Sequence, residues 1–165
     1  MEIRIAKNEN DSISASAIYA ASWKAAYKNI YSVELLSAIP SDFWVAAFNN
    51  NYKTHRFEIA ILKNDGEDLG AGGYGLSRDY PEKNYGEITS IYFIEKAWGK
   101  GFAQALMNFM MKKLNAMGYP KIHVWVLKDN MRAQVFYEKC GFNKTGNEKE
   151  IIIKGENKME VEYIV

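Results

Sequence analysis

The sequence contains a glycine-rich turn whose residue types can bind a phosphate. It reads Trp98-Gly99-Lys100-Gly101-Phe102-Ala103 and lies between an apolar segment and a helical pattern. The first amides of a helix have no partner within the helix, and the helix dipole adds positive potential at the same end. Glycines let an anion approach those amides, and Lys100 can add a charge. The turn therefore predicts a local phosphate site.

Two glycines alone also fit a plain tight turn, so the surrounding sequence has to separate the classes of site. A dinucleotide-binding fold needs a third glycine, but Ala105 and Leu106 stand there. A kinase-type phosphate loop needs Gly-Lys-Ser or Gly-Lys-Thr, and this chain has Gly-Lys-Gly. Both nucleotide classes are disfavoured, while the plain turn stays open.

Composition limits the other function classes. With 21 basic and 20 acidic residues the net charge is +1, so no overall field attracts nucleic acid or an anionic membrane. Cys140 is the only cysteine, which excludes an intrachain disulfide, and no metal-ligand spacing is present. The N-terminus is charged where a signal peptide is apolar, and no apolar run has membrane-spanning length. We expect a cytoplasmic protein with a single domain over residues 1–165.

Apolar periodicity predicts the elements that position the turn. A central strand at residues 88–94 is too apolar to have a solvated face, and an amphipathic helix follows the turn to about residue 117. On a later helix capped by Asn130, we expect Val135, Phe136 and Cys140 to point inward. The other predicted elements are strands at residues 3–5, 57–62, 69–76, 122–127, 149–154 and 159–164, and helices at 12–29 and 33–48, the latter interrupted near Pro40. This order predicts an α+β fold with a mixed sheet.

Three motifs in order resemble one known family. The central strand from Glu87 to Phe93, the turn, and the segment from Asn130 to Phe142 resemble the GNAT superfamily of acyl-CoA-dependent N-acyltransferases. The resemblance covers the middle third of the chain, and the element order on both sides agrees with it. It implies a mostly antiparallel sheet of about seven strands flanked by about four helices. The family usually has Arg or Gln at the first turn position, where this chain has Trp98.

The resemblance implies acetyl-CoA as cosubstrate and assigns residues to it. The pantetheine arm would lie like an added strand along the central strand, and the pyrophosphate would bind the amides of the turn. Asn130 matches a coenzyme-contacting residue of the family, although its position fits a helix cap equally well. The implied coenzyme-binding residues are Ile91, Tyr92, Phe93, Gly99, Lys100, Gly101, Phe102, Ala103, Gln104 and Asn130.

The same resemblance implies catalytic roles. Tyr137 matches a tyrosine that protonates the departing thiolate, the alternative being a half-buried aromatic beside Phe136. An amine acceptor must lose a proton before it attacks, and Glu87 is our first choice for the base; a solvated residue at a strand start is the alternative. His123 is the next candidate, while Trp125 occupies the position where some relatives have a carboxylate. Some members of the family have no assigned base.

We therefore expect an N-acetyltransferase that acts on a primary amine by direct attack, with a small molecule such as a polyamine or amino acid favoured as acceptor. The alternatives are a non-catalytic acyl-CoA-binding domain and a transferase acting on protein N-termini or lysines. Trp23 is predicted to be core, while Tyr27 and Tyr31 can be core or acceptor-pocket residues. Scattered carboxylates can attract a cationic acceptor, and relatives often form homodimers; the carboxylates are Glu34, Asp42, Asp79 and Glu82.

Overall fold

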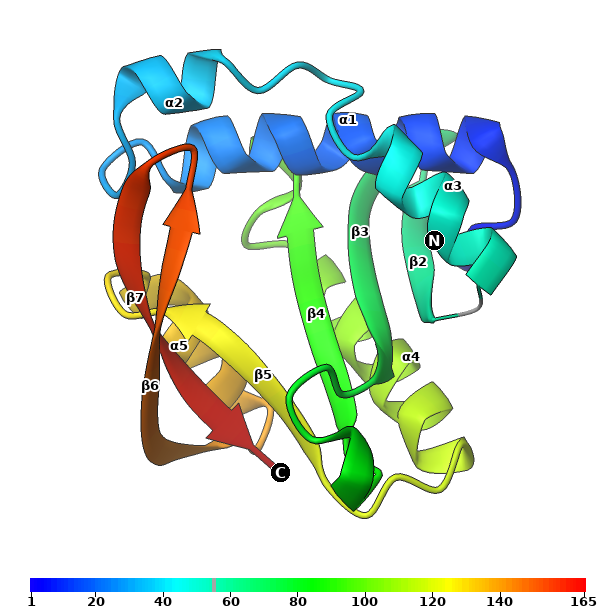
Figure 1. Ribbon diagram of the computed structural model, residues 1–165. Coiled ribbons are helices and arrows are strands. Elements are labelled where there is room, and N and C mark those ends of the chain that lie inside the picture. Colours follow the sequence, from blue (N-terminus) through cyan, green and yellow to red (C-terminus); the bar gives the residue numbers. More distant parts are fainter. Residues whose placement is uncertain (55) are drawn as a thin grey trace.

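The computed structural model describes residues 1–54 and 56–165. Its strands form one seven-stranded sheet in the order β1-β2-β3-β4-β5-β7-β6 (Figure 1). The strands are β1 (Glu2–Ile5), β2 (Phe57–Asn64), β3 (Glu67–Leu76), β4 (Gly86–Phe93), β5 (Ile122–Leu127), β6 (Asn143–Ile153) and β7 (Glu156–Ile164). The α-helices are α1 (Glu9–Ala26), α2 (Val33–Ser37), α3 (Val45–Thr54), α4 (Phe102–Ala116) and α5 (Met131–Lys139).

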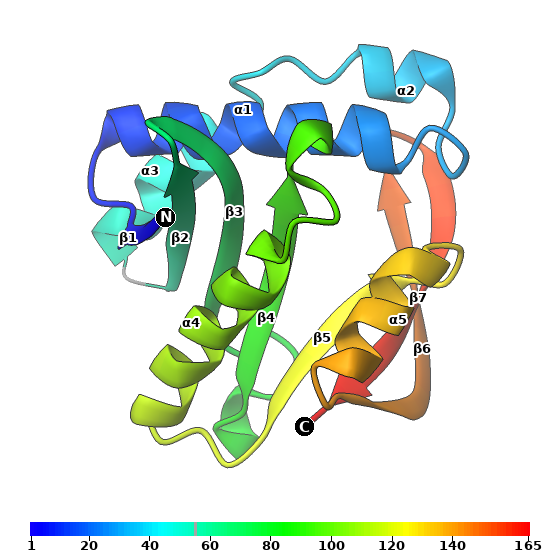
Figure 2. The same ribbon diagram turned by 180° about the vertical axis from the view of Figure 1, so that it is seen from behind.

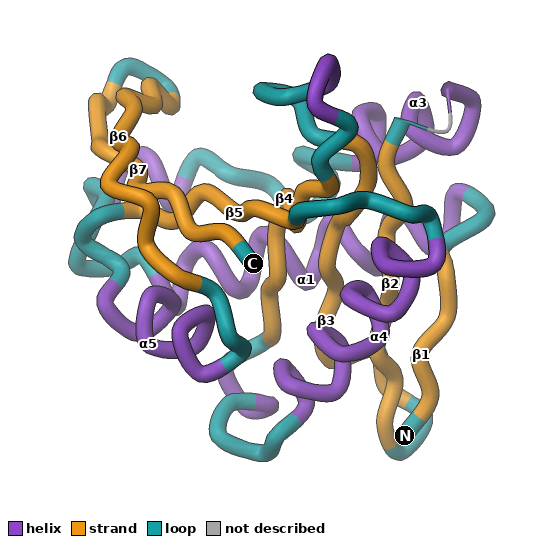
Figure 3. The backbone as a smooth tube through the Cα atoms, turned by 90° about the horizontal axis from the view of Figure 1, so that it is seen from below, coloured by secondary structure: helices purple, strands orange, loops and turns teal. Residues whose placement is uncertain are grey.

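The predicted mixed, mostly antiparallel sheet is confirmed. Among the strands of the described residues only β4 and β5 pair in parallel, and every other neighbouring pair is antiparallel. Figure 3 shows β1 and the β6–β7 hairpin at opposite ends of this sheet. A parallel pair needs a long crossover, and α4 supplies it between β4 and β5. The phosphate turn therefore lies where the chain leaves the central strand for this crossover helix.

Helices cover both faces of the sheet. Ala60 and Leu62 of β2 belong to a core cluster with α4 and α5, while Ile59 and Ile61 belong to a cluster with α1 and α3. Because side chains alternate along a strand, these two clusters lie on opposite faces. Figure 2 shows the face covered by α4 and α5. Within the described residues no helix is long and apolar enough to cross a membrane.

Residues 1–54 and 56–165 contain five α-helices, in agreement with the figure of about four that the resemblance implied. The segment predicted as one interrupted helix at residues 33–48 forms α2 and α3, separated by residues 38–44. Pro40 has no amide hydrogen and forces the residue before it away from helical dihedrals. The chain therefore leaves the helix at Ala38, which caps α2, and starts again at Val45.

Two further details differ from the sequence prediction. The last two strands are longer, with β6 starting at Asn143 rather than near residue 149 and β7 at Glu156 rather than near 159. On α5, Val135 is 45% exposed, whereas Phe136 and Cys140 are partly buried as predicted. The buried stripe of α5 passes through Gln134 and Tyr137, and Val135 lies roughly half a turn away from Tyr137.

Candidate active site

The sheet opens between β4 and β5. Their parallel register contains only Gly86 with Ile122 and Glu87 with His123, after which the two strands diverge (Figure 1). Within the described residues the inner edges of both strands have no strand partner beyond that point. A cavity of about 230 Å³ lies in the opening, bordered by β4, β5, α5, the phosphate turn and α1.

The backbone of β4 presents hydrogen-bonding groups to this opening. The Ile94 amide donates to the carbonyl of Leu69 of β3 at 3.1 Å. Along an antiparallel strand the backbone groups of successive residues point to opposite sides, so those of Ile91 and Phe93 point away from β3, toward β5. Gly73 and Tyr74 of β3 pair with Ser90 and Ile88, so Thr89 of β4 is the extra residue of a bulge. The amide and carbonyl of Ile91 and the amide of Phe93 can therefore pair with an extended ligand, whereas the Phe93 carbonyl accepts from the Trp98 indole. The backbone of Tyr92, which the resemblance also assigned to the ligand, faces β3.

The glycine turn has the backbone that only glycine adopts readily. Gly99 and Gly101 have φ values of 73° and 80°, and Gly101 is the N-cap of α4 with no side-chain capping bond. A Cβ built on either glycine meets no atom within 4 Å, so the glycines serve the conformation and leave open space beside the amides. The first-turn amides of α4 are thus available to an anion.

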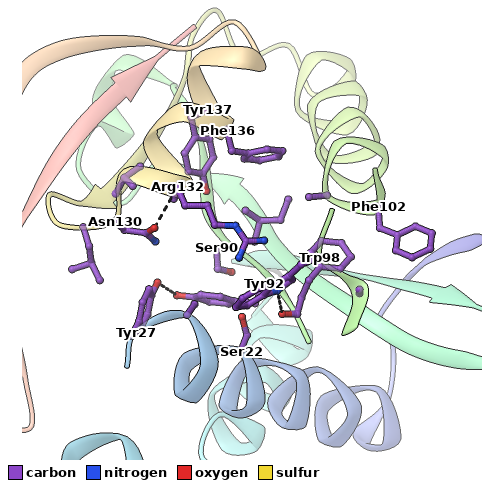
Figure 4. A pocket seen from close by; sticks show the side chains of 18 of the residues that line it. Ser22, Tyr27, Ser90, Tyr92, Trp98, Phe102, Asn130, Arg132, Phe136 and Tyr137 are labelled. Atoms are coloured by element: carbon purple, nitrogen blue, oxygen red, sulfur yellow. Dashed lines mark hydrogen bonds between the residues drawn. The ribbon is translucent and has the colours of Figure 1, made fainter. Parts of the chain in front are cut away.

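The structure brings most of the predicted site residues to one cavity (Figure 4). The residues that border it are Ile91, Tyr92, Phe93, Gly99, Gly101, Phe102, Ala103, Asn130 and Tyr137. Lys100 and Gln104 belong to the turn but do not border the cavity; the Gln104 side chain hydrogen-bonds Asn108 and Cys140. Asn130 does cap α5, because its Oδ1 accepts from the amide of Ala133 at 3.1 Å, and its side-chain amide group remains on the cavity wall.

Arg132 is a cavity residue that the sequence analysis did not identify. Its guanidinium lies 3.9 Å from the centre of the Trp98 ring, and Figure 4 shows it reaching from α5 across the opening. The Trp98 indole donates to the carbonyl of Phe93 at 2.8 Å, which fixes the ring. A guanidinium on an indole face is held by cation–π attraction. Trp98 thus holds a cation beside the turn although it carries no charge itself.

Tyr137 projects from α5 toward the cavity (Figure 4) and is 5% exposed. Its ring makes edge contacts with Phe136 and Phe142. Among the described residues no hydrogen-bond partner is found for its hydroxyl, and burial raises the pKa of the phenol above its usual value. The phenol therefore stays protonated near neutral pH, the state in which it can donate a proton.

Glu87 lies at the closed end of the β4–β5 opening and is not part of the cavity wall. Its carboxylate is 1% exposed and accepts from the backbone amide of Arg78 at 3.0 Å and from the Arg78 guanidinium. The ion pair raises the pKa of Arg78. Arg78 itself borders a second cavity, of about 410 Å³, which shares Thr89, Ser90 and Tyr92 with the first.

His123, the second candidate base, is fully buried and away from the cavity. Its Nε2 lies 2.7 Å from the hydroxyl of Ser77, and its Nδ1 lies 3.4 Å from a carboxylate oxygen of Glu162. This order of groups is that of a hydrolase triad, but Ser77 is 2% exposed and its hydroxyl accepts from the amides of Asp79 and Tyr80. Burial lowers the pKa of His123, so the ring is neutral and stabilises the loop after β3.

Aromatic side chains fill the space between α1 and β4. Trp23 is 8% exposed and is core, as predicted, and it stacks on Tyr31, which is 4% exposed. Tyr27 is equally buried but borders the cavity, where its hydroxyl lies 3.2 Å from that of Tyr92 (Figure 4). Of the scattered carboxylates, Asp79 accepts from the Trp125 indole and pairs with Lys149.

A carboxylate that the sequence analysis did not single out completes the wall. Glu160 of β7 borders the same cavity as Tyr137, Tyr27 and Trp125. Nothing in the local sequence separates it from the other glutamates of the strand, because only the pairing of β7 with β5 brings it beside the opening.

Comparison with known proteins gives the family. The family model of the acetyltransferase (GNAT) family matches residues 18–142, so the chain belongs to the GNAT acetyltransferase family. The chain is 25% identical over 138 residues to YuaI of Bacillus subtilis strain 168, described as an uncharacterized N-acetyltransferase; the match covers 82% of this chain and 76% of YuaI.

Two solved structures share the fold. The PaiA N-acetyltransferase of Thermoplasma acidophilum, in complex with coenzyme A, is 18% identical with a TM-score of 0.71, covering 98% of each chain. The putative acetyltransferase yncA of Salmonella typhimurium, with its cofactor acetyl-CoA, is 16% identical with a TM-score of 0.74, covering 100% of this chain and 92% of the other. Both confirm the GNAT-like architecture expected from the sequence.

Proposed function

We propose that this chain binds acetyl-CoA in the β4–β5 opening and transfers its acetyl group to a primary amine of a small molecule. The carrying observation is that one cavity joins the glycine turn, the free inner edges of two strands and the hydroxyl-bearing ring of Tyr137. The coenzyme complexes of two structural neighbours support the choice of ligand. The whole chain, residues 1–165, would act as one domain.

Each part of the coenzyme has a matching group. The pyrophosphate binds the amides of residues 99–104, and Arg132 adds a positive charge beside them. The pantetheine arm pairs with the backbone of Ile91 and Phe93 as an additional strand. The thioester then lies in the cavity near Tyr137, and an amide of β4 polarises its carbonyl.

Transfer requires three bond changes. The amine nitrogen attacks the thioester carbon, the carbon–sulfur bond breaks, and Tyr137 gives its proton to the departing thiolate. The nitrogen loses a proton as the amide forms, which restores the Tyr137 hydroxyl. Glu87 remains our sequence-based prediction for the base that first deprotonates the ammonium group, and its bond to Arg78 connects it to the second cavity.

Contacts between the β6–β7 turn and the segment after α1 favour a small acceptor over a polypeptide. Glu156, at the start of β7, accepts from the backbone amide of Ser32 at 3.2 Å and from the Ser32 hydroxyl. Lys158 lies 5.6 Å from the centre of the Tyr31 ring. These contacts tie the β6–β7 turn to the segment after α1, so an extended polypeptide would have to break them to pass between the two segments.

The test is thiol release from acetyl-CoA with a panel of polyamines, amino acids, aminoglycosides and peptides. We expect at least one small amine to be acetylated faster than any peptide. Tyr137→Phe should reduce kcat by about 10²-fold while coenzyme binding is retained, because only the proton donor is lost. Binding of acetyl-CoA without thiol release for any acceptor would instead support a non-catalytic acyl-CoA-binding domain.

A further inference from the structure

Strand β7 presents a row of charged side chains on the face of the sheet opposite α4 and α5. Val161 and Tyr163 of β7 pack in the core on the α4 and α5 side, so the alternating residues Glu156, Lys158, Glu160 and Glu162 face the other way. Glu156 is bound to Ser32, and Glu162 accepts from the side chains of Thr145 and Asn147. Three members of the row thus have partners within the protein, since Lys158 lies over Tyr31.

Glu160 differs from its neighbours in the row. It is partly buried, it borders the cavity that also contains Tyr137, and among the described residues its carboxylate has no hydrogen-bond partner. A partly buried carboxylate is normally hydrogen-bonded, because removing it from water without a partner is unfavourable. Its oxygens are not sealed off by the protein, so they can accept a hydrogen bond from a group that binds in the cavity.

The charges around Glu160 are already engaged with one another. Arg78 pairs with Glu87, and Lys149 pairs with Asp79 and lies over the Trp125 ring. Burial raises the pKa of Glu160, the nearby carboxylates of Asp79 and Glu87 raise it further, and Lys149 and Arg78 lower it. Tyr31 and Tyr92, on the other side, are neutral phenols whose own pKa values Glu160 helps to raise. Since both nearby cations have other partners, the site can accept a cationic ligand.

We propose that Glu160 binds the ammonium group of the acceptor and acts as the general base that deprotonates it. The inference rests on the proposed transferase function. The ammonium ion gives one proton to the Glu160 carboxylate, and the neutral amine attacks the thioester carbon while the carbon–sulfur bond breaks. The thiolate takes its proton from Tyr137, the second nitrogen proton returns to Tyr137, and the proton on Glu160 leaves to solvent.

This assignment differs in a measurable way from the prediction that Glu87 is the base. The Glu87 carboxylate is 1% exposed and accepts from the backbone amide and the guanidinium of Arg78, so replacing Glu87 disrupts these buried hydrogen bonds, although the Arg78 side chain itself is 48% exposed. Glu160→Gln keeps the shape of the side chain and breaks no hydrogen bond within the described protein. Loss of Glu87 should therefore reduce stability, whereas loss of Glu160 should reduce turnover of a protonated amine.

The experiment compares wild type, Glu160→Gln, Glu87→Gln and the control Glu150→Gln, an exposed position on β6. The probe is the primary amine from the panel that the wild type acetylates fastest. We expect Glu160→Gln to lower kcat/KM about 10²-fold, with acetyl-CoA affinity unchanged by calorimetry. The wild-type kcat/KM should fall as pH decreases through the raised pKa of Glu160, and Glu160→Gln should lose this acidic limb. Glu150→Gln should match the wild type in both measurements.

An alkoxyamine of similar size serves as a second probe, because its nitrogen is neutral at pH 7 and needs no base. It therefore distinguishes the loss of the base from the loss of contacts between Glu160 and the acceptor. Glu160→Gln should acetylate this probe at the wild-type rate; an equal loss with both probes would overturn the base role. If the wild type is active and Glu160→Gln has the same kcat/KM and pH profile, the inference about Glu160 is overturned while the proposed function still holds. A wild type that acetylates no amine would remove the proposed function and this inference with it.

Discussion

At the scale of single residues, the cationic side chain beside the glycine turn comes from α5 and not from the turn itself. The turn begins with Trp98, which is uncharged, and its ring supports the guanidinium of Arg132 from the first turn of α5. Compared with the Arg or Gln that is usual in the family at this position, Trp98 lacks a polar side-chain group. The stacking explains how positive charge is nevertheless present beside the turn, since an indole face holds a guanidinium without neutralising it.

We predict that Arg132→Ala weakens acetyl-CoA binding about 10-fold, because one charge-assisted contact to phosphate contributes about 1.5–3 kcal/mol when dry and less at an exposed position. Isothermal calorimetry measures this change. Lys139→Ala, at an exposed position at the end of the same helix, is the matched control and should bind like the wild type. Equal affinities for Arg132→Ala and the control would show that Arg132 does not contact the coenzyme.

The residues implied by the three motifs were predictable because each motif is local in the chain. Gly99, Gly101, Asn130 and Tyr137 all border the cavity, as expected. Glu160 was not, because β7 contains several alternating glutamates and only its pairing with β5 decides which one borders the opening. The partner of Glu87 was equally hidden, since Arg78 reaches it across the connection from β3 to β4.

At the scale of elements, the strongly periodic segments were predicted well and the polar ones poorly. The central strand and α4 have continuous apolar patterns, so their bounds agree closely with the sequence prediction. The first half of β6 is polar and exposed, and it belongs to the strand because Asn143, Lys144 and Glu148 pair with β7, with an irregularity between Lys144 and Glu148. Contacts between distant segments, which no local pattern records, decided those bounds.

The bulge at Thr89 of β4 provides a test at the same scale. Gly73 pairs with Ser90, and a Cβ at this position would overlap the Thr89 hydroxyl oxygen. We predict that Gly73→Ala lowers the free energy of unfolding by about 1–3 kcal/mol, measured by urea denaturation. Adding Thr89→Ala removes the overlapping oxygen and should restore part of the loss. A double variant no more stable than Gly73→Ala would place the strain elsewhere.

At the scale of the whole molecule, the sheet consists of two parts joined by a short seam. Strands β1 to β4 form one part and β5, β7 and β6 the other, and only two residue pairs of β4 and β5 connect them in register. A ligand that lies along the inner edges would bridge the parts over the length of the opening. Binding of such a ligand should then stabilise the inner edges of β4 and β5 together.

We predict that saturating acetyl-CoA slows amide hydrogen exchange at Ile91 and Phe93 of β4 and in the glycine turn and first turn of α4. The reason is that these amides gain an acceptor in the complex, whereas within the protein they have no strand partner or capping group. At 100 times the dissociation constant, the complex gains about 2.7 kcal/mol over the free protein, which also raises Tm. Hydrogen exchange with mass spectrometry measures the local effect, and β1 and β2, far from the opening in the strand order, are the internal reference.

Gly101→Glu should abolish both effects while the exchange of β1 and β2 stays as in the wild type. The new carboxylate would stand in open space beside the amides of α4, where it repels the phosphates, although the positive φ of 80° also adds some local strain. If acetyl-CoA still protected the turn in this variant, the phosphates would have to bind somewhere other than the glycine turn. The same conclusion would follow if acetyl-CoA protected β4 of the wild type but not the glycine turn. One coenzyme molecule that lies along β4 and binds its phosphates at the turn must protect both segments.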